Sequence, residues 1–338
     1  MPVPSRPRVL AALLAPLAAL ALAACGGSAS SGTDAAAASA EGATIAHAFG
    51  ETTVPADPTR VVTWGWGSSD AAVALGVVPV AMPHESYAGD EQGVLPWLRE
   101  RLEADGEQVP TVLPEQQAVP IEAIAAADPD LVLAPYSGIT KEEYEQLSQI
   151  APTVAPPGEA WATPWRETVE IVGEALGKAD EAEQLLADID ASVAEQAAEH
   201  PQLEGKTVAM VWDTPDAFYV YKPADARVAF TEDLGLTTAP AVERLASGDE
   251  TFYYTLSEER LAELDSDILV TYADSAQASQ AFLSSAPAGL MEQVQRGSVA
   301  QVVGTELVSA VSPPTALSLT YGLEDYVDAL AAAADRVG

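Results

Sequence analysis

One block of sequence occurs twice in this chain, at an offset of 137 residues, on either side of a long helical stretch. The first copy runs from Ile121 to Leu133 and the second from Glu258 to Val270. In both copies a short segment with Glu at its second position leads through an Asp-x-Asp turn into a run of Val, Leu and Ile. This order is typical of a short helix, a turn and a buried strand. The chain is therefore predicted to contain two copies of one α/β unit.

The segments upstream of the two copies agree as well. Arg60-Val-Val-Thr corresponds to Lys206-Thr-Val-Ala, and Ala-Leu-Gly-Val at 74–77 corresponds to Asp-Leu-Gly-Leu at 233–236. Each half thus has the pattern of βα units built on the same plan. We predict an α/β protein with two βα lobes joined by a single long helix and with a ligand cleft between the lobes.

The joining helix is predicted from apolar residues that recur at steps of three and four between Val169 and Val193. Gly177 and Lys178 mark a break between two helical pieces. The second piece, from about 180 to 200, contains no Pro or Gly and would extend on the order of 30 Å at 1.5 Å per residue. Because a continuous helix resists bending, we expect the lobes to tilt only slightly when a ligand binds.

The start of the chain is a targeting segment. Arg6 and Arg8 precede an apolar run from Val9 to Ala24, which is shorter than the roughly 20 residues that a membrane-spanning helix needs. The run ends in Leu-Ala-Ala-Cys25, which resembles the lipobox of bacterial lipoproteins, so Cys25 is the predicted lipidation site. The alternative is an ordinary secretion signal followed by an incidental cysteine.

A stretch rich in Gly, Ser and Ala follows Cys25 and has almost nothing to bury, as expected for a flexible linker. The predicted organisation has five parts: a lipoprotein signal peptide at 1–24, a flexible tether at 25–43, an N-terminal α/β lobe at 44–167, the inter-lobe helix at 168–204 and a C-terminal α/β lobe at 205–338.

Charge and composition exclude several classes of function. Acidic residues outnumber basic ones by 51 to 15, and this negative field repels nucleic acids and anionic membrane surfaces. The single cysteine excludes disulfides within the chain. Three scattered histidines, His47, His84 and His200, are too few to form a transition-metal cage, so neither a metal site nor a cofactor is expected.

The sequence offers no strong signal for an enzyme. It contains no Gly-x-Ser-x-Gly elbow and no His-Glu-x-x-His motif. Gly65-x-Gly67 resembles the start of a dinucleotide-binding loop, but Asp70 stands where the third glycine should be. No pair among the many acidic residues stands out as catalytic.

Aromatic residues make up only 6% of the chain, yet many of them directly follow predicted strands, such as those at 61–63, 77–80 and 131–133. In βα sheets, side chains just past the carboxyl ends of the strands line the ligand crevice. The candidate ligand-binding residues are Trp64, Trp66, Tyr87, Tyr136, Trp165, Arg166, Trp212, Tyr221, Arg227 and Tyr272. Arg227 is the first candidate for a charged contact, followed by Arg166 and Lys222.

The order of lipobox, tether, first lobe, long helix and second lobe resembles the solute-binding lipoproteins of bacterial ABC importers. Within these it is similar to the class with a rigid inter-lobe helix, whose members bind ferric siderophores, haem or cobalamin. The resemblance covers about residues 44–335, and its most specific motif is the block from Glu122 to Val132. The stretch Tyr136-Ser-Gly-Ile-Thr140 and its continuation to Val154 are similar to the ferric-siderophore branch.

This resemblance implies a protein outside the cytoplasm that is anchored to the bacterial cell membrane through the Cys25 lipid only. It would act as a monomer, capture a ferric siderophore and deliver it to an ABC permease and its ATPase. Glu122 and Glu259 match the acidic residues with which the family contacts arginines of the permease, although a carboxylate at a helix start is also favoured by the helix dipole.

Several alternatives stay open at this point. The ligand could be haem or cobalamin, with His84 as a conceivable axial ligand, or the chain could be a lipid-anchored sensor or enzyme domain. Within the siderophore interpretation, an anionic catecholate complex would need arginine contacts, whereas a nearly neutral hydroxamate complex would depend more on aromatic walls.

Overall fold

The computed structural model describes residues 41–115 and 118–337. The predicted signal peptide, the lipidation site Cys25 and most of the predicted tether lie outside the described residues. The first strand begins at Glu41, so the first lobe starts slightly before the predicted boundary at 44. Among the described residues, no helix is both long and apolar enough to cross a membrane.

The sheet of the first lobe consists of five short parallel strands in the order β5-β4-β3-β6-β7. These strands are β3 (Val61–Thr63), β4 (Ala81–Met82), β5 (Thr111–Val112), β6 (Leu131–Leu133) and β7 (Thr153–Val154). The helices of the lobe are α1 (Ser68–Ala74), α2 (Pro96–Asp105), α3 (Ile121–Ala126), α4 (Lys141–Leu147) and α5 (Trp165–Ala175). An antiparallel hairpin of β1 (Glu41–His47) and β2 (Gly50–Pro55) precedes this sheet.

The prediction of a strand at 77–80 is wrong, because the regular strand pairing begins only at Ala81. The N–H of Val77 donates to the carbonyl of Ala72 at the end of α1, so this residue belongs to the helix end rather than to a strand. The short strand β4 nevertheless leads into the loop that carries Tyr87, as predicted.

The second sheet is mixed rather than purely parallel, with the order β11-β9-β8-β12-β13 and with β10 also paired to β8. The parallel strands are β8 (Thr207–Asp213), β10 (Thr237–Thr238), β12 (Ile268–Ala273) and β13 (Val299–Val303), and the antiparallel ones are β9 (Phe218–Tyr221) and β11 (Tyr253–Leu256).

The helices of the second lobe are α7 (Ala226–Glu232), α8 (Pro240–Leu245), α9 (Ala276–Leu283), α10 (Glu292–Arg296), α11 (Thr305–Val311) and α12 (Ser318–Ala334). Three short 3-10 turns are also present, η1 (Pro201–Leu203), η2 (Glu258–Glu263) and η3 (Ala288–Leu290). The two α/β lobes predicted from the duplicated block are therefore confirmed.

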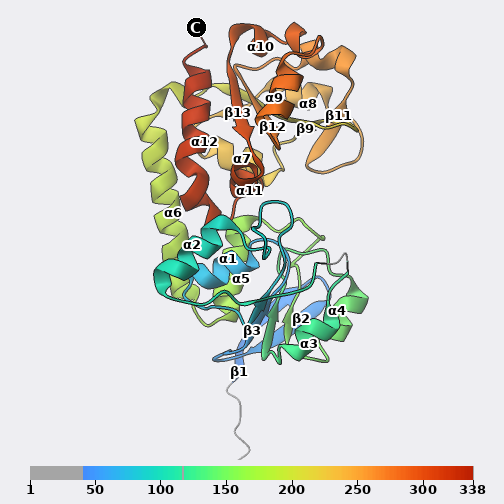
Figure 1. The fold of residues 1–338 in the computed structure, drawn as a ribbon, viewed down its shortest axis with the longest axis vertical. Coiled ribbons are helices and arrows are strands. Elements are labelled where there is room, and N and C mark those ends of the chain that lie inside the picture. The colour runs from blue at the N-terminus through green and yellow to red at the C-terminus, as the bar shows by residue number, and fades with distance from the viewer. Residues whose placement is uncertain (1–40, 116–117, 338) are drawn as a thin grey trace, which may run out of the picture. The chain divides into compact units, whose positions relative to one another are not determined.

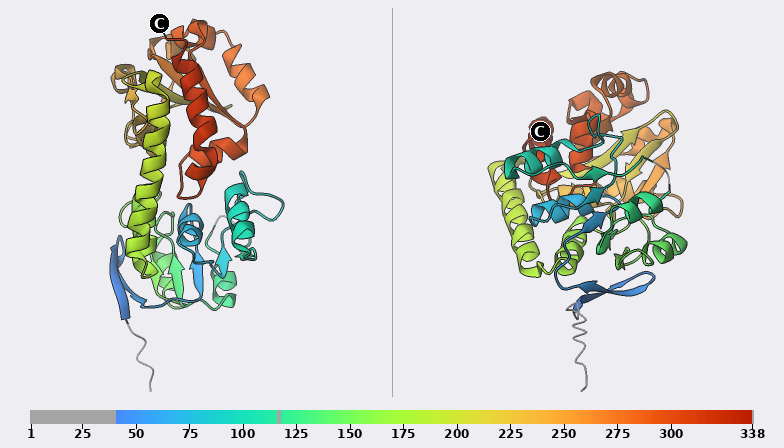
Figure 2. Two further views of the ribbon diagram at one scale, coloured as in Figure 1. Left: turned by 90° about the vertical axis from the view of Figure 1, so that its left-hand side faces the viewer. Right: turned by 60° about the horizontal axis from the view of Figure 1, so that its bottom comes forward.

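The helix α6 (Ala179–Glu199) runs between the two lobes without interruption. It packs against α5 at one end and against α12 at the other (Figures 1 and 2). The predicted break before it is real, with Gly177 in the left-handed region at φ 67°. Gly173 of α5 lets the two helices approach closely, since a Cβ there would lie 2.4 Å from that of Ala182. The predicted inter-lobe segment at 168–204 thus contains the end of α5, the whole of α6 and η1.

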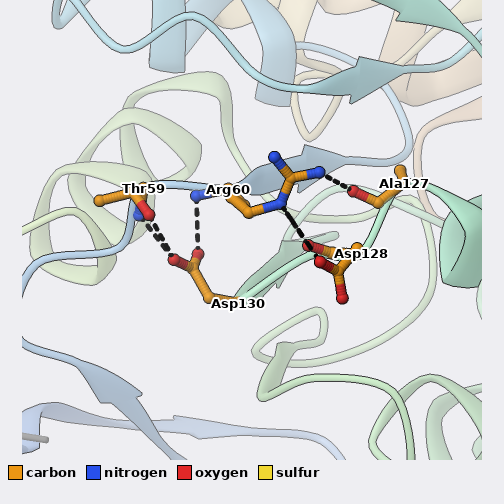
Figure 3. A network of polar contacts seen from close by, with 5 residues as sticks. All are labelled: Thr59, Arg60, Ala127, Asp128 and Asp130. Atoms are coloured by element: carbon orange, nitrogen blue, oxygen red, sulfur yellow. Dashed lines mark hydrogen bonds and ion pairs between the residues drawn. The ribbon is translucent and has the colours of Figure 1, made fainter.

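The duplicated block makes the same polar contact in both lobes, and Figure 3 shows it in the first lobe. In the first lobe the Asp130 carboxylate accepts hydrogen bonds from the backbone N–H and the hydroxyl of Thr59, at 2.8 and 2.9 Å. In the second lobe Asp267 accepts the same two bonds from Thr207, also at 2.8 and 2.9 Å. Each aspartate ties the start of its own strand to the start of the neighbouring strand, so the repeated Asp-x-Asp turn fixes how the central strands align.

A guanidinium also satisfies the carbonyls of this turn in each lobe. Arg60 donates to the carbonyl oxygens of Ala127 and Asp128, at 2.5 and 2.6 Å (Figure 3). In the second lobe the arginine comes from a different place in the sequence, because Arg296 donates to the carbonyls of Ser266 and Asp267. In both lobes an arginine thus donates to the carbonyls of the turn, although the two arginines are not related by the offset of 137 residues.

Removal of the Asp267 carboxylate is expected to destabilise the second lobe. In Asp267→Ala the N–H and hydroxyl of Thr207 lose their acceptor, and we expect the free energy of unfolding to fall by about 1–3 kcal/mol. Desolvation raises the pKa of Asp267, but the Thr207 hydrogen bonds outweigh it and the net shift is downward. The full difference in stability between the wild type and Asp267→Ala is therefore expected near neutral pH. It should shrink as the pH falls through the lowered pKa of Asp267.

Denaturation followed by circular dichroism at several pH values measures this difference. The matched control is Asp265→Ala, which removes an exposed carboxylate two residues earlier in the same turn. Equal stability losses in the two variants would contradict the role given to Asp267.

Candidate functional site

Five aromatic side chains lie on one face of the second sheet, and we call this set the aromatic face. In the strand register Tyr272 lies beside Trp212, Trp212 beside Tyr219, and Tyr221 beside Tyr253. Directly opposed residues project to the same face of a sheet. The ring centroids of Trp212 and Tyr272 are 6.0 Å apart, those of Tyr221 and Tyr272 6.2 Å, and those of Tyr219 and Tyr253 5.4 Å. The opposite face packs against a core of aliphatic residues together with Phe218, Tyr254 and Phe282.

Sequence analysis missed Tyr219 and Tyr253. The alternation in Phe218-Tyr-Val-Tyr221 could have indicated Tyr219, since it places Tyr219 and Tyr221 on one side of the strand. Tyr253 follows only from the antiparallel pairing of β11 with β9, which no local pattern specifies.

Arg227 lies over this aromatic face. Its guanidinium carbon is 3.8 Å from the ring centroid of Tyr221 and 5.8 Å from that of Tyr272. The side chain comes from the first turn of α7, and its Nε donates to Asp225 at 2.7 Å. Asp225 also caps α7 by accepting the N–H of Arg227 at 2.9 Å. Arg227 was predicted as a site residue, whereas Asp225 was missed.

The ion pair of Arg227 and Asp225 is almost entirely buried, with exposed side-chain fractions of 13% and 5%. Burial raises the pKa of the Asp225 carboxyl, and the charge and hydrogen bonds of Arg227 oppose that shift. Burial alone would lower the pKa of Arg227, but the surrounding acidic groups, Asp225 above all, raise it overall. The guanidinium is therefore fully charged and held beside its counter-ion.

The first lobe brings two of its predicted aromatic residues to the same place. The ring of Tyr87, from the loop after β4, lies 6.5 Å from the ring of Trp212, and its hydroxyl donates to the Asp274 carboxylate. Burial raises the pKa of Tyr136, the charge of Asp225 raises it further, and the charge of Arg227 lowers it. A residue of the first lobe, Tyr87, thus contacts the aromatic face of the second lobe.

Trp66 joins the two lobes through a hydrogen bond. Its indole N–H donates to the carbonyl of Pro313 at 3.1 Å, across from the first lobe to the segment that precedes α12. A small cavity beside it is also lined by Tyr136, Trp165 and Thr315.

The remaining candidates make other packing and ionic contacts. Trp64 packs at the margin of the aliphatic core of the first lobe. Trp165 is buried at the start of α5, and the guanidinium of Arg166 lies 4.4 Å from its ring centroid. Arg166 is also paired with Asp190 of α6 and with Asp233, at 2.6 and 2.9 Å. A ligand contact by Trp64, Trp165 or Arg166 stays a prediction.

Two carboxylates that the sequence did not single out as site residues lie below the cleft. Asp70 of α1 is fully buried and accepts hydrogen bonds from Trp97 Nε1 at 2.6 Å and from the Thr315 hydroxyl at 2.5 Å. It shares a small cavity with Glu85. Desolvation, assisted by the charge of Asp70, raises the pKa of Glu85 to about 7. The N-cap of α1 is Gly67, so neither Asp70 nor a serine side chain caps this helix.

The two symmetric acidic residues occupy equivalent exposed turns. Glu122 lies in the first turn of α3 and Glu259 in the first turn of η2, and both are exposed. Within residues 41–115 and 118–337 neither carboxylate takes part in an ion pair. In the same part of the chain, no group of three or more His, Cys, Asp or Glu side chains lies close enough together to hold a metal ion.

A family profile, a sequence relative and two solved structures resemble this chain over most of its length. The sequence profile of a family described as periplasmic binding protein matches residues 61–302. A probable siderophore-binding lipoprotein of Bacillus subtilis (strain 168), YfiY, is 30% identical over 257 residues, which cover 75% of each chain. Among solved structures, Streptococcus pneumoniae TIGR4 PiaA in complex with ferrichrome aligns with a TM-score of 0.78 and 32% identity over 87% of this chain and 99% of that one. A periplasmic solute binding protein from Mycobacterium smegmatis str. MC2 155 aligns with a TM-score of 0.75 and 30% identity over 86% and 98%.

The raised pKa of Glu85 predicts a specific dependence of stability on pH. Between the ordinary value of 4.5 and about 7 the folded protein retains a proton that the unfolded chain has released. This group therefore lowers stability as the pH rises through that window, by up to about 3 kcal/mol. Glu85→Gln cannot ionise, so the variant should be more stable than the wild type above pH 7 and nearly equal to it near pH 4.5.

Urea denaturation across this pH range measures the effect. Glu91→Gln, an exposed residue of the same loop, serves as the control and should follow the wild type. A Glu85→Gln variant that loses stability above pH 7 would show that the ionised carboxylate is favourable there.

Proposed function

This chain belongs to the periplasmic binding protein family, and we propose that it captures a ferric siderophore in the cleft between its lobes and delivers the complex to an ABC importer. Members of this family are binding proteins rather than enzymes. Relatives that align over most of the chain are a probable siderophore-binding lipoprotein and a protein solved with ferrichrome. Their ligands support the proposal for this chain.

The observation that carries the proposal is the contact of a first-lobe ring with the aromatic face of the second lobe, over which Arg227 lies. Tyr87 from the first lobe reaches Trp212 of the aromatic face, and Tyr136 lines a small cavity together with Trp66 and Thr315. Flat rings bury a large apolar area at low entropic cost, which suits the organic shell of a bulky chelate. The guanidinium supplies fixed donors for the oxygen atoms that surround the iron.

The alternative of haem or cobalamin receives less support from the geometry. The ring of His84 packs against the backbone of Gly93 so closely that a Cβ on that glycine would lie 2.3 Å from the His84 Cδ2 atom. Its Nδ1 is buried and has no hydrogen-bond partner among the described residues. A ring confined in this way is poorly placed to serve as an axial ligand.

Delivery to the importer would use the two equivalent acidic turns. Glu122 and Glu259 are exposed carboxylates on the same repeated block, one on each lobe. Such a pair suits a permease that presents two basic surfaces to the two lobes. Anchorage outside the cytoplasm through a lipid on Cys25 completes the proposal.

Titration of the protein with ferric siderophores, haemin and cobalamin tests the binding function. We expect a ferric siderophore to bind, and we expect Trp212→Ala to weaken it by about 1–2 kcal/mol, because the variant loses one wall of the cleft. Calorimetry is the suitable measurement, since the variant also loses a fluorophore. Tyr144→Leu is the control, because that ring packs on His47 and Phe49 of the first lobe. Tight binding of haemin alone, or no binding by any ferric siderophore, would refute the proposal.

The docking role predicts a loss of uptake without a loss of binding. In the double variant Glu122→Gln/Glu259→Gln, ferric siderophore uptake by cells should fall about tenfold or more, because two charge contacts with the permease are removed. The matched control is Glu142→Gln/Glu292→Gln, which removes two exposed carboxylates from the first turns of α4 and α10. Radioactive iron uptake and calorimetry on the same variants separate transport from binding. Normal uptake by the first double variant would contradict the docking role.

A further inference from the structure

We infer that the cleft selects a ferric chelate without net negative charge, and that Asp225 sets this selection by compensating the charge of Arg227. This inference rests on the proposed function, because it names the class of ferric chelate that the same cleft accepts. It concerns a residue with no obvious ligand-binding signal in the sequence, where Asp225 simply occupies a helix cap.

Arg227 is the only basic side chain that lies over a ring of the aromatic face, within the part of the chain that the structure describes. The other two basic candidates are engaged elsewhere. Arg166 is paired with Asp190 and Asp233, and Lys222 donates to the carbonyl of Glu250 at 2.5 Å. A chelate in this cleft therefore meets one guanidinium at most.

The charge of that guanidinium is already balanced. Arg227 Nε and Asp225 Oδ1 are 2.7 Å apart, and both side chains are shielded from solvent. In such surroundings the charges of the two partners act on a ligand as a nearly neutral pair. Of the guanidinium nitrogens, Nε is the one that donates to Asp225, which leaves the terminal nitrogens to donate to ligand oxygens. The site thus offers hydrogen bonds without offering net positive charge.

The other titratable groups at the cleft are acidic. Asp274 accepts the hydroxyl of Tyr87, and Glu85 lies below, beside the buried Asp70. The Asp274 carboxylate repels a polyanion at short range, and the net charge of −36 repels it at long range.

The two classes of ferric chelate differ in net charge. Three singly charged hydroxamates balance Fe³⁺ and give an uncharged complex, whereas three doubly charged catecholates leave three surplus negative charges. The first kind of complex can enter an aromatic cleft with a neutral ion pair and lose little solvation. The second would bring several negative charges into a poorly solvated, acidic site without a free counter-ion, which is strongly unfavourable.

The test compares three probes of different charge, namely ferrichrome (uncharged), ferrioxamine B (one positive charge) and ferric enterobactin (three negative charges). We expect the wild type to bind at least one of the first two about a hundredfold or more tightly than ferric enterobactin, a difference of about 2.7 kcal/mol. If ferric enterobactin binds as tightly as the better of the other two or more tightly, the inference fails while the proposed function stands. If no probe binds and no other ferric siderophore does, the proposed function itself fails.

The role of Asp225 is tested with Asp225→Asn, which keeps an oxygen for the N–H of Arg227 but releases the guanidinium charge. Affinity for ferric enterobactin should rise about tenfold in this variant, equivalent to about 1.4 kcal/mol, while affinity for ferrichrome stays within about threefold. A merely structural residue would lose affinity for every probe. Asp225→Glu restores the charge and should restore the wild-type preference, and Asp265→Asn, with the same change of charge far along the sequence, should leave it unaltered. An unchanged ratio of the two affinities in a folded Asp225→Asn protein would overturn the role of Asp225.

Discussion

One buried carboxylate, that of Asp70, forms a hydrogen-bonded link between the two lobes. Asp70 of α1 is buried, and its desolvation, which raises its pKa, is opposed by hydrogen bonds from Trp97 Nε1 of α2 and from the hydroxyl of Thr315. Thr315 belongs to the segment that leads into α12 of the second lobe. A buried carboxylate needs both donors to avoid a large desolvation penalty. The N-terminal helix of one lobe is thereby bound to the C-terminal helix of the other, and Trp66 adds a second bond nearby.

The duplicated architecture was predictable because its determinants are local. The Asp-x-Asp turns precede strongly apolar strands, and the structure shows why both copies keep the second aspartate: Asp130 and Asp267 accept the same pair of hydrogen bonds. The helix α6 was predictable for a similar reason, since its periodicity extends over 21 residues. The antiparallel pairing of β9 with β8 was not, because a four-residue apolar strand has the same pattern in either orientation.

The candidate site was predictable in its aromatic content but not in its electrostatics. A tyrosine or tryptophan after a strand indicates the carboxyl edge of a sheet, and Tyr87 follows β4 in this way. Trp212 and Tyr272 instead lie within β8 and β12 and are neighbours through the strand register. An aspartate at a helix cap, in contrast, indicates only the helix start. Whether Asp225 also holds an arginine depends on how α7 is seated against the sheet, which is decided by distant packing. The same limit applies to Arg166, whose partners Asp190 and Asp233 lie far from it in the sequence.

The contact of Tyr87 with Asp274 has a kinetic consequence. Its ring lies beside Trp212 and its hydroxyl is bonded to a carboxylate of the opposite lobe, so the structure spans its own cleft at this point. In the proposed function, a chelate that reaches Trp212 from this side would have to displace the Tyr87 ring and break its bond with Asp274. The side chain that links the two lobes here would then also limit how fast the ligand enters and leaves.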